Sequence, residues 1–68
     1  MELLATRSIT ETIAKAMEQA DRIKNIVIIY ETNDDEKTSH GICVPGAMTL
    51  AQINFLCDVG KEYVFEKL

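Results

Sequence analysis

A run of five apolar residues, Ile26–Tyr30, dominates the hydrophobic pattern of this chain. Nearly all of its side chains are β-branched or aromatic, which suits a pleated strand and is unfavourable in a helix. The run is unbroken rather than alternating, and such a pattern is typical of a strand that is covered on both faces. We therefore expect a first strand over about residues 25–32, around which the remaining elements are organised.

A helix is predicted before this strand. Its start is marked by a capping box at Ser8 and Glu11, in which the serine hydroxyl accepts a hydrogen bond from the amide three residues later. The helix should end near Asn25, and residues 1–7 should be frayed. Apolar residues recur at helical spacing along it and define one narrow apolar stripe. The apolar stripe comprises Ile9, Ile13, Ala16, Met17, Ala20 and Ile23.

A weaker second strand is predicted over about residues 39–44. Pro45 and Gly46 should end it, because proline cannot donate to a strand ladder and glycine frees the backbone. The polar run at residues 33–38 should form the loop between the two strands. This loop is short enough to make them an antiparallel hairpin.

A second helix is predicted from Leu50 to about Glu66, capped by Thr49 and Gln52. Its apolar residues span more than half of the circumference, far wider than a single packing contact requires. Gly60 lies in mid-helix, where glycine costs about 1 kcal/mol relative to alanine, and the close approach of another backbone would account for it. The main face comprises Ile53, Leu56, Cys57, Gly60 and Val64, and it is extended by Phe55, Val59 and Tyr63.

These elements predict an α+β fold of order α-β-β-α, in which an antiparallel hairpin packs against two helices within a single small domain, residues 1–68. A lone hairpin is marginal in water, and chains this short rarely build a sufficient core. We therefore expect a homodimer, formed either by joining hairpins edge to edge or by packing them face to face. The interface candidates are Ile26, Ile28, Tyr30, Phe55, Val59 and Tyr63.

Composition narrows the classes of function. Hydrophobic residues make up 47% and charged residues 26% of the chain, as in ordinary globular proteins. The formal net charge of −4 and the scattered basic residues disfavour nucleic acid as a partner. The N-terminus lacks a signal-peptide pattern and no segment is long and apolar enough to span a membrane, which predicts a cytoplasmic protein with no membrane partner and with reduced thiols.

Candidate chemistry is sparse. His40, Cys43 and Cys57 are the soft metal ligands, but the first two lie three apart on a strand and should point to opposite faces, so no metal is expected. Cys57 as a nucleophile with His40 as its base is disfavoured, because a thiol buried in a helix is inert. The acidic run at residues 33–36 lacks the ligand spacing of a calcium-binding loop. We predict no catalytic residue and no cofactor.

The layout of residues 24–68 resembles that of small phage- or prophage-encoded proteins with no assigned activity. The likeness is carried by Ile26–Thr32, the short acidic turn, the weak second strand and Met48–Asp58. It implies a bacterial or phage origin and an accessory role, and it supplies no site residues.

The leading hypothesis from the sequence is a small non-enzymatic module that contacts protein and works as a homodimer. A second is an acidic inhibitor or nucleic-acid mimic that binds a basic partner surface, with Glu31, Asp34, Asp35 and Glu36 in place of phosphates. A third is an enzyme whose site is shared across a dimer interface, where His40 and Tyr63 could line it.

Overall fold

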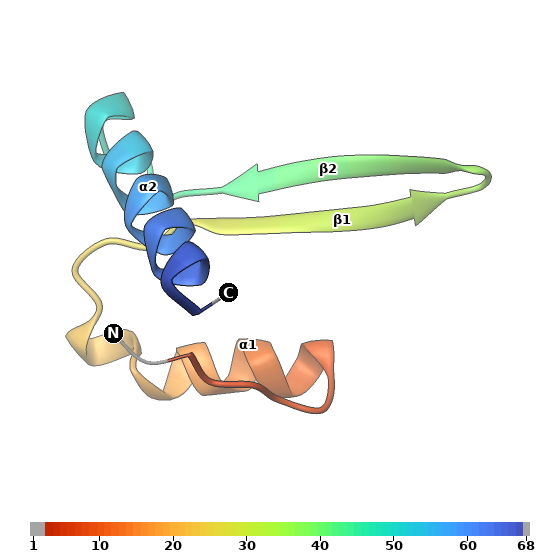
Figure 1. The fold of residues 1–68 in the computed structure, drawn as a ribbon, viewed down its shortest axis with the longest axis horizontal. Coiled ribbons are helices and arrows are strands. Elements are labelled where there is room, and N and C mark those ends of the chain that lie inside the picture. Colours follow the sequence, from red (N-terminus) through yellow and green to blue (C-terminus); the bar gives the residue numbers. More distant parts are fainter. Residues whose placement is uncertain (1–2, 68) are drawn as a thin grey trace.

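The computed structural model describes residues 3–67. It contains two α-helices, a short 3-10 helix and one two-stranded antiparallel sheet (Figure 1). The predicted α-β-β-α order and the antiparallel hairpin are therefore confirmed. The elements are α1 (Ile9–Glu18), η1 (Ala20–Arg22), β1 (Ile28–Asp34), β2 (Lys37–Cys43) and α2 (Leu50–Lys67).

The predicted serine cap forms at α1, and the full predicted capping box forms at α2. The amide of Glu11 donates to the Ser8 hydroxyl at 3.1 Å, which satisfies one of the unpaired donors of the first turn of α1. At α2 the pairing is reciprocal: the Gln52 amide donates to Thr49 Oγ1 at 3.1 Å, and the Thr49 amide donates to Gln52 Oε1 at 2.8 Å. Local side-chain chemistry thus fixes the start of each helix.

The first helix ends earlier than predicted. Regular α-helix stops at Glu18, and the chain tightens into η1, a form common at helix ends. Of the segment expected to be frayed, residues 1–2 lie outside the described residues. Residues 3–7 form neither helix nor strand, and within them the Thr6 hydroxyl donates to the Ser8 carbonyl at 3.2 Å.

The first strand lies further along the chain than predicted. β1 begins at Ile28 rather than at residue 25, and it ends two residues later than expected, at Asp34. The register pairs Ile28 with Cys43, so Ile26 would stand opposite Pro45. Because proline has no amide hydrogen to donate, the ladder cannot continue in that direction.

The hairpin also closes more tightly than predicted. The expected loop at residues 33–38 shrinks to two residues, since Asp34 pairs with Lys37. Asp35 takes a φ of 58°, a region that a two-residue hairpin turn requires and that Asp tolerates. Polar residues join the ladder here because strand pairing uses backbone groups and both faces of the tip are exposed.

Tyr30 and Gly41 are in contact across the hairpin. They are direct cross-strand partners, and the tyrosine ring lies over the glycine. A Cβ atom on Gly41 would overlap that ring. Glycine at this position therefore lets the aromatic side chain lie flat across β2.

Replacing Gly41 with Ala should lower the free energy of unfolding by about 1–3 kcal/mol, because the Tyr30 ring must move to admit the added methyl group. Gly46 is the matched control, since nothing lies within 4 Å of a Cβ placed there. Urea unfolding of Gly41→Ala and Gly46→Ala measures the difference. Equal stability of the two variants would contradict the ring placement.

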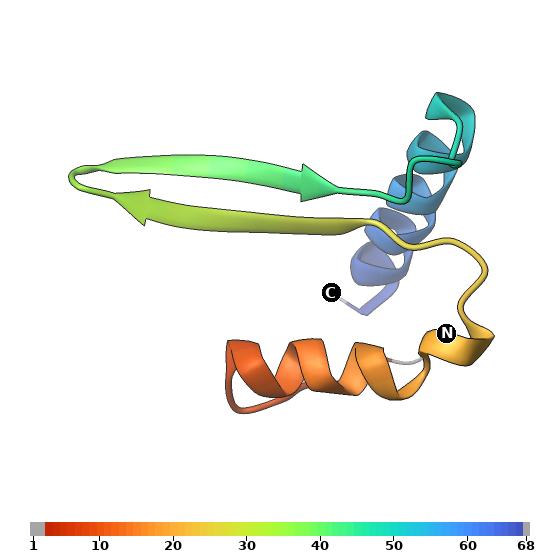
Figure 2. The ribbon, with the colours of Figure 1, turned by 180° about the vertical axis from the view of Figure 1, so that it is seen from behind.

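The predicted packing of the hairpin against two helices is not found within one chain. Among the described elements, close backbone approaches join only β1 with β2 and α1 with η1. The hairpin projects from the rest of the chain, α2 crosses its base, and α1 lies apart from it (Figures 1 and 2). No residue in the described part of the chain is buried.

The accessible surface and the radius of gyration both show that the chain is less compact than a globular domain of its size. Its accessible surface is 6352 Å², whereas a compact protein of 7.6 kDa has about 4,300 Å². Its radius of gyration is 13.5 Å, against about 11 Å for a compact domain of this length. Apolar surface that a stable fold must cover is therefore left in contact with solvent.

Candidate interaction surface

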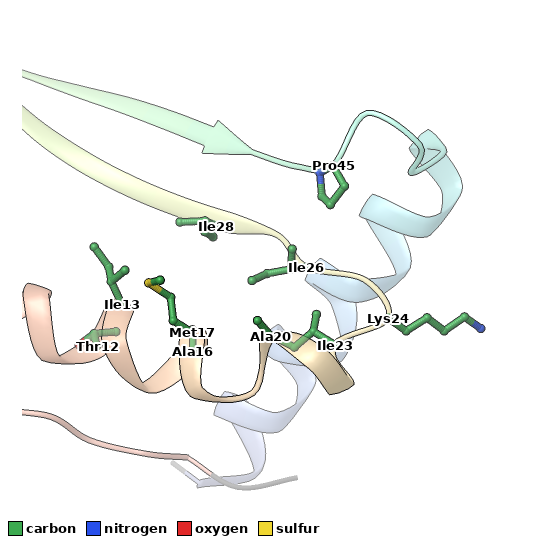
Figure 3. Close-up of a pocket in the computed structure, with 10 residues that line it drawn as sticks. All are labelled: Thr12, Ile13, Ala16, Met17, Ala20, Ile23, Lys24, Ile26, Ile28 and Pro45. Carbon is green, nitrogen blue, oxygen red and sulfur yellow. The ribbon is translucent and has the colours of Figure 1, made fainter.

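An apolar groove separates α1 from the start of β1, and we call it the α1–β1 groove (Figure 3). Its volume is about 400 Å³. One wall is the apolar stripe of α1 and η1, and the other is the chain around the base of the hairpin. The lining residues are Thr12, Ile13, Ala16, Met17, Ala20, Ile23, Lys24, Ile26, Ile28 and Pro45.

The helical wall follows directly from the spacing of apolar residues. Positions three and four apart lie on one face of a helix, which aligns Ile13, Ala16, Met17 and Ala20 along the groove. Figure 3 shows Ile13 and Met17 pointing from α1 toward the hairpin side. Their side chains are nevertheless 53% and 70% exposed, so the helix presents an apolar face that its own chain does not cover.

The opposite wall is formed by Ile26, Ile28 and Pro45. Ile26 is half-buried in the segment that leads into β1, and Ile28 is the first residue of the ladder. Side chains alternate along a strand, so Ile28 and Tyr30 share one face of the hairpin, while Ile29 belongs to the other. The wall is therefore one defined face of the hairpin base.

The groove is almost free of charge. In the described part of the chain, Lys24 is the one ionisable residue that lines it, and Figure 3 shows its side chain directed away from the apolar residues. A contiguous apolar surface with little charge is typical of a protein contact site and not of a site that binds a polar ligand.

The structure divides the predicted interface residues between two places. Ile26 and Ile28 line the α1–β1 groove, and Tyr30 lies on the same hairpin face further along β1. The remaining candidates lie on α2. Of these, Val59 and Tyr63 are half-buried, whereas Phe55 is 69% exposed.

Sequence reasoning missed the contribution of α1 to this surface. The apolar stripe was assigned to packing inside the chain, because a narrow stripe is what a helix with a single packing contact shows. Its spacing could have identified Ile13 and Met17 as surface residues only if the position of the hairpin were known. In the structure the two walls face each other without meeting.

His40 lies on the hairpin face opposite to that of Ile28. Its Nε2 is 3.1 Å from the carboxylate of Glu31, the residue directly across the ladder. Alternation along β2 places Cys43 on the other face, as predicted from their spacing. Tyr63, the proposed companion of His40 in a shared enzyme site, lies on α2, which has no close backbone approach to β2 within one chain.

The cysteines are both free thiols, Cys43 exposed and Cys57 half-buried. In the part of the chain that the structure describes, no three His, Cys, Asp or Glu side chains are grouped so that they could hold a metal ion. Within residues 3–67, no helix has the length and apolar character needed to cross a membrane.

The acidic residues of the hairpin separate into two groups. Asp34, Asp35 and Glu36 lie with Lys37 at the projecting tip. Glu31 lies further down β1 beside His40. The four acids proposed to imitate phosphates therefore do not form one continuous surface.

Comparison of the chain with protein-family models, with curated proteins and with solved structures gave no match.

Proposed function

We propose that this protein is a small non-enzymatic module that acts through protein contacts and works as a homodimer in an accessory role. The observation that carries the proposal is the absence of any buried residue among residues 3–67, together with the large apolar area that they expose. Folding must overcome a conformational entropy cost of about 1–2 kcal/mol per ordered residue, and buried apolar surface is the main term that offsets it. A chain without a core of its own needs a second chain to supply one.

The area that a second copy could bury is comparable with that of known obligate homodimer interfaces. A compact globule of two such chains would require them to bury about 5,600 Å² between them, starting from 6352 Å² exposed by each. Obligate homodimer interfaces span about 2,000–5,000 Å² or more, and they resemble a domain core cut in half. In the proposed homodimer, the two chains therefore associate and fold in one event.

Unfolding should depend on protein concentration if this proposal holds. For a dimer that dissociates as it unfolds, raising the concentration shifts the equilibrium toward the folded pair by mass action. We expect the thermal midpoint, followed by circular dichroism, to rise steadily between about 1 and 100 μM. A midpoint that stays constant over this range would contradict obligate dimerisation.

An acidic inhibitor that binds a basic partner surface is the second candidate. It is favoured by the projection of Asp34, Asp35 and Glu36 at the free end of the hairpin (Figure 1). The variant Asp35→Asn/Glu36→Gln separates the two functions, because it removes charge from the tip and leaves the apolar surfaces intact. Loss of binding to an arginine-rich peptide at low salt, with an unchanged dimer mass, would support the second candidate.

A further inference from the structure

We propose that the α1–β1 groove is one half of an apolar core, and that the same groove of a second copy completes it across a two-fold axis. This inference rests on the proposed homodimer and assigns the surface through which it forms. In such an isologous contact, each copy supplies and receives the same residues. Ile13, Met17 and Ile28 of one chain would then pack against their counterparts and neighbours in the other.

The narrowness of the apolar stripe decides how the second copy approaches. If α1 of one copy were inserted between the two walls of the other groove, it would need apolar side chains on opposite sides. The side of α1 away from the stripe carries Glu11, Lys15 and Glu18, which form ion pairs along the helix surface and with Arg7. Two grooves placed face to face require each stripe to point in one direction only, toward the shared core.

Charge also favours this surface for contact between identical chains. Each copy carries a formal net charge of −4, so two copies repel each other over most of their surface. Among residues 3–67, no acidic residue lines the α1–β1 groove, and the lysine that does, Lys24, is directed away from it. Two copies can therefore meet there without bringing carboxylates together.

Thiol labelling can measure whether the groove is covered. In one chain, Ala16 and its neighbour Lys15 are both exposed, but only Ala16 lines the groove. The small substitutions Ala16→Cys and Lys15→Cys each add one reporter thiol, and peptide mass spectrometry distinguishes it from Cys43 and Cys57. We expect Ala16→Cys to be alkylated at least tenfold more slowly than Lys15→Cys at 100 μM protein. Dilution toward 1 μM should remove this protection, since a second copy provides it.

The dimer mass, measured on the same samples, distinguishes the failure of this inference from that of the proposed function. If Ala16→Cys is a dimer and reacts as fast as Lys15→Cys, the copies associate elsewhere, for example edge to edge through their hairpins, and this inference is overturned alone. If both variants and the unmodified chain are folded monomers, both proposals fail. Protection that persists in a monomer would also overturn the inference, because the chain itself would then close the groove.

Discussion

Replacing Ile13 with Asp is expected to dissociate the dimer and unfold the chain. Ile13 lies near the N-terminal end of the α1 wall of the groove and is 53% exposed within one chain. In a lone chain the substitution would therefore be mild. In the proposed shared core it places a carboxylate in apolar surroundings without a partner, at a cost of several kcal/mol that a symmetric dimer bears twice.

The adjacent residue supplies a matched control. Ala14→Asp introduces the same side chain into the same helix, and its propensity cost is the larger of the two because alanine is a better helix former than isoleucine. Ala14 is exposed and does not line the groove. Circular dichroism and light scattering should show Ala14→Asp folded and dimeric and Ile13→Asp unfolded at 20 μM. Equal behaviour of the two would remove α1 from the interface.

Replacing Ile28 with Asp is expected to have a similarly large effect from the other wall. Ile28 is 46% exposed in one chain and lines the groove at the base of the hairpin. The proposed dimer buries this face, so a carboxylate there would again lack a partner. Because the chain has no core of its own, loss of the interface should appear as loss of the folded state as well as loss of the dimer.

Ile29 tests whether the effect belongs to one face of the hairpin. It is the next residue along β1, points to the opposite face and is 63% exposed. Its direct partner across the ladder is Ile42, and an apolar cross-strand pair contributes up to about 1 kcal/mol. Ile29→Asp should therefore lower stability by about 1 kcal/mol in urea unfolding and leave the dimer mass unchanged. If Ile29→Asp dissociated the dimer and Ile28→Asp did not, the interface would lie on the Ile29 face of the hairpin, and the proposed face would be wrong.

Local chemistry made the order of the elements and the starts of the two α-helices predictable from the sequence. Ser8 and Thr49 mark the two helix starts, because each hydroxyl satisfies an amide three residues away. Pro45 ends the ladder, although sequence reasoning placed that end one residue too late, at Val44 rather than Cys43. Such features depend on a few adjacent residues, so they form independently of how the helices and the hairpin are arranged.

The position of β1 and the identity of the groove depend on partners that are distant in sequence. Apolar composition indicated a strand at Ile26, but the register with β2 excludes that residue and draws the polar residues Asn33 and Asp34 into the ladder. The groove required knowledge of where α1 lies relative to Ile28. On the broad apolar face predicted for α2, Phe55 is exposed, whereas Val59 and Tyr63 are half-buried.

The mass of the folded protein in solution shows whether two copies share one core. Light scattering after size-exclusion chromatography at about 50 μM should give twice the 7.6 kDa mass of the chain. We expect this dimer mass together with a cooperative unfolding transition, because the second copy would supply the core that residues 3–67 of one chain do not form. A folded, cooperatively unfolding species of 7.6 kDa at that concentration would contradict it.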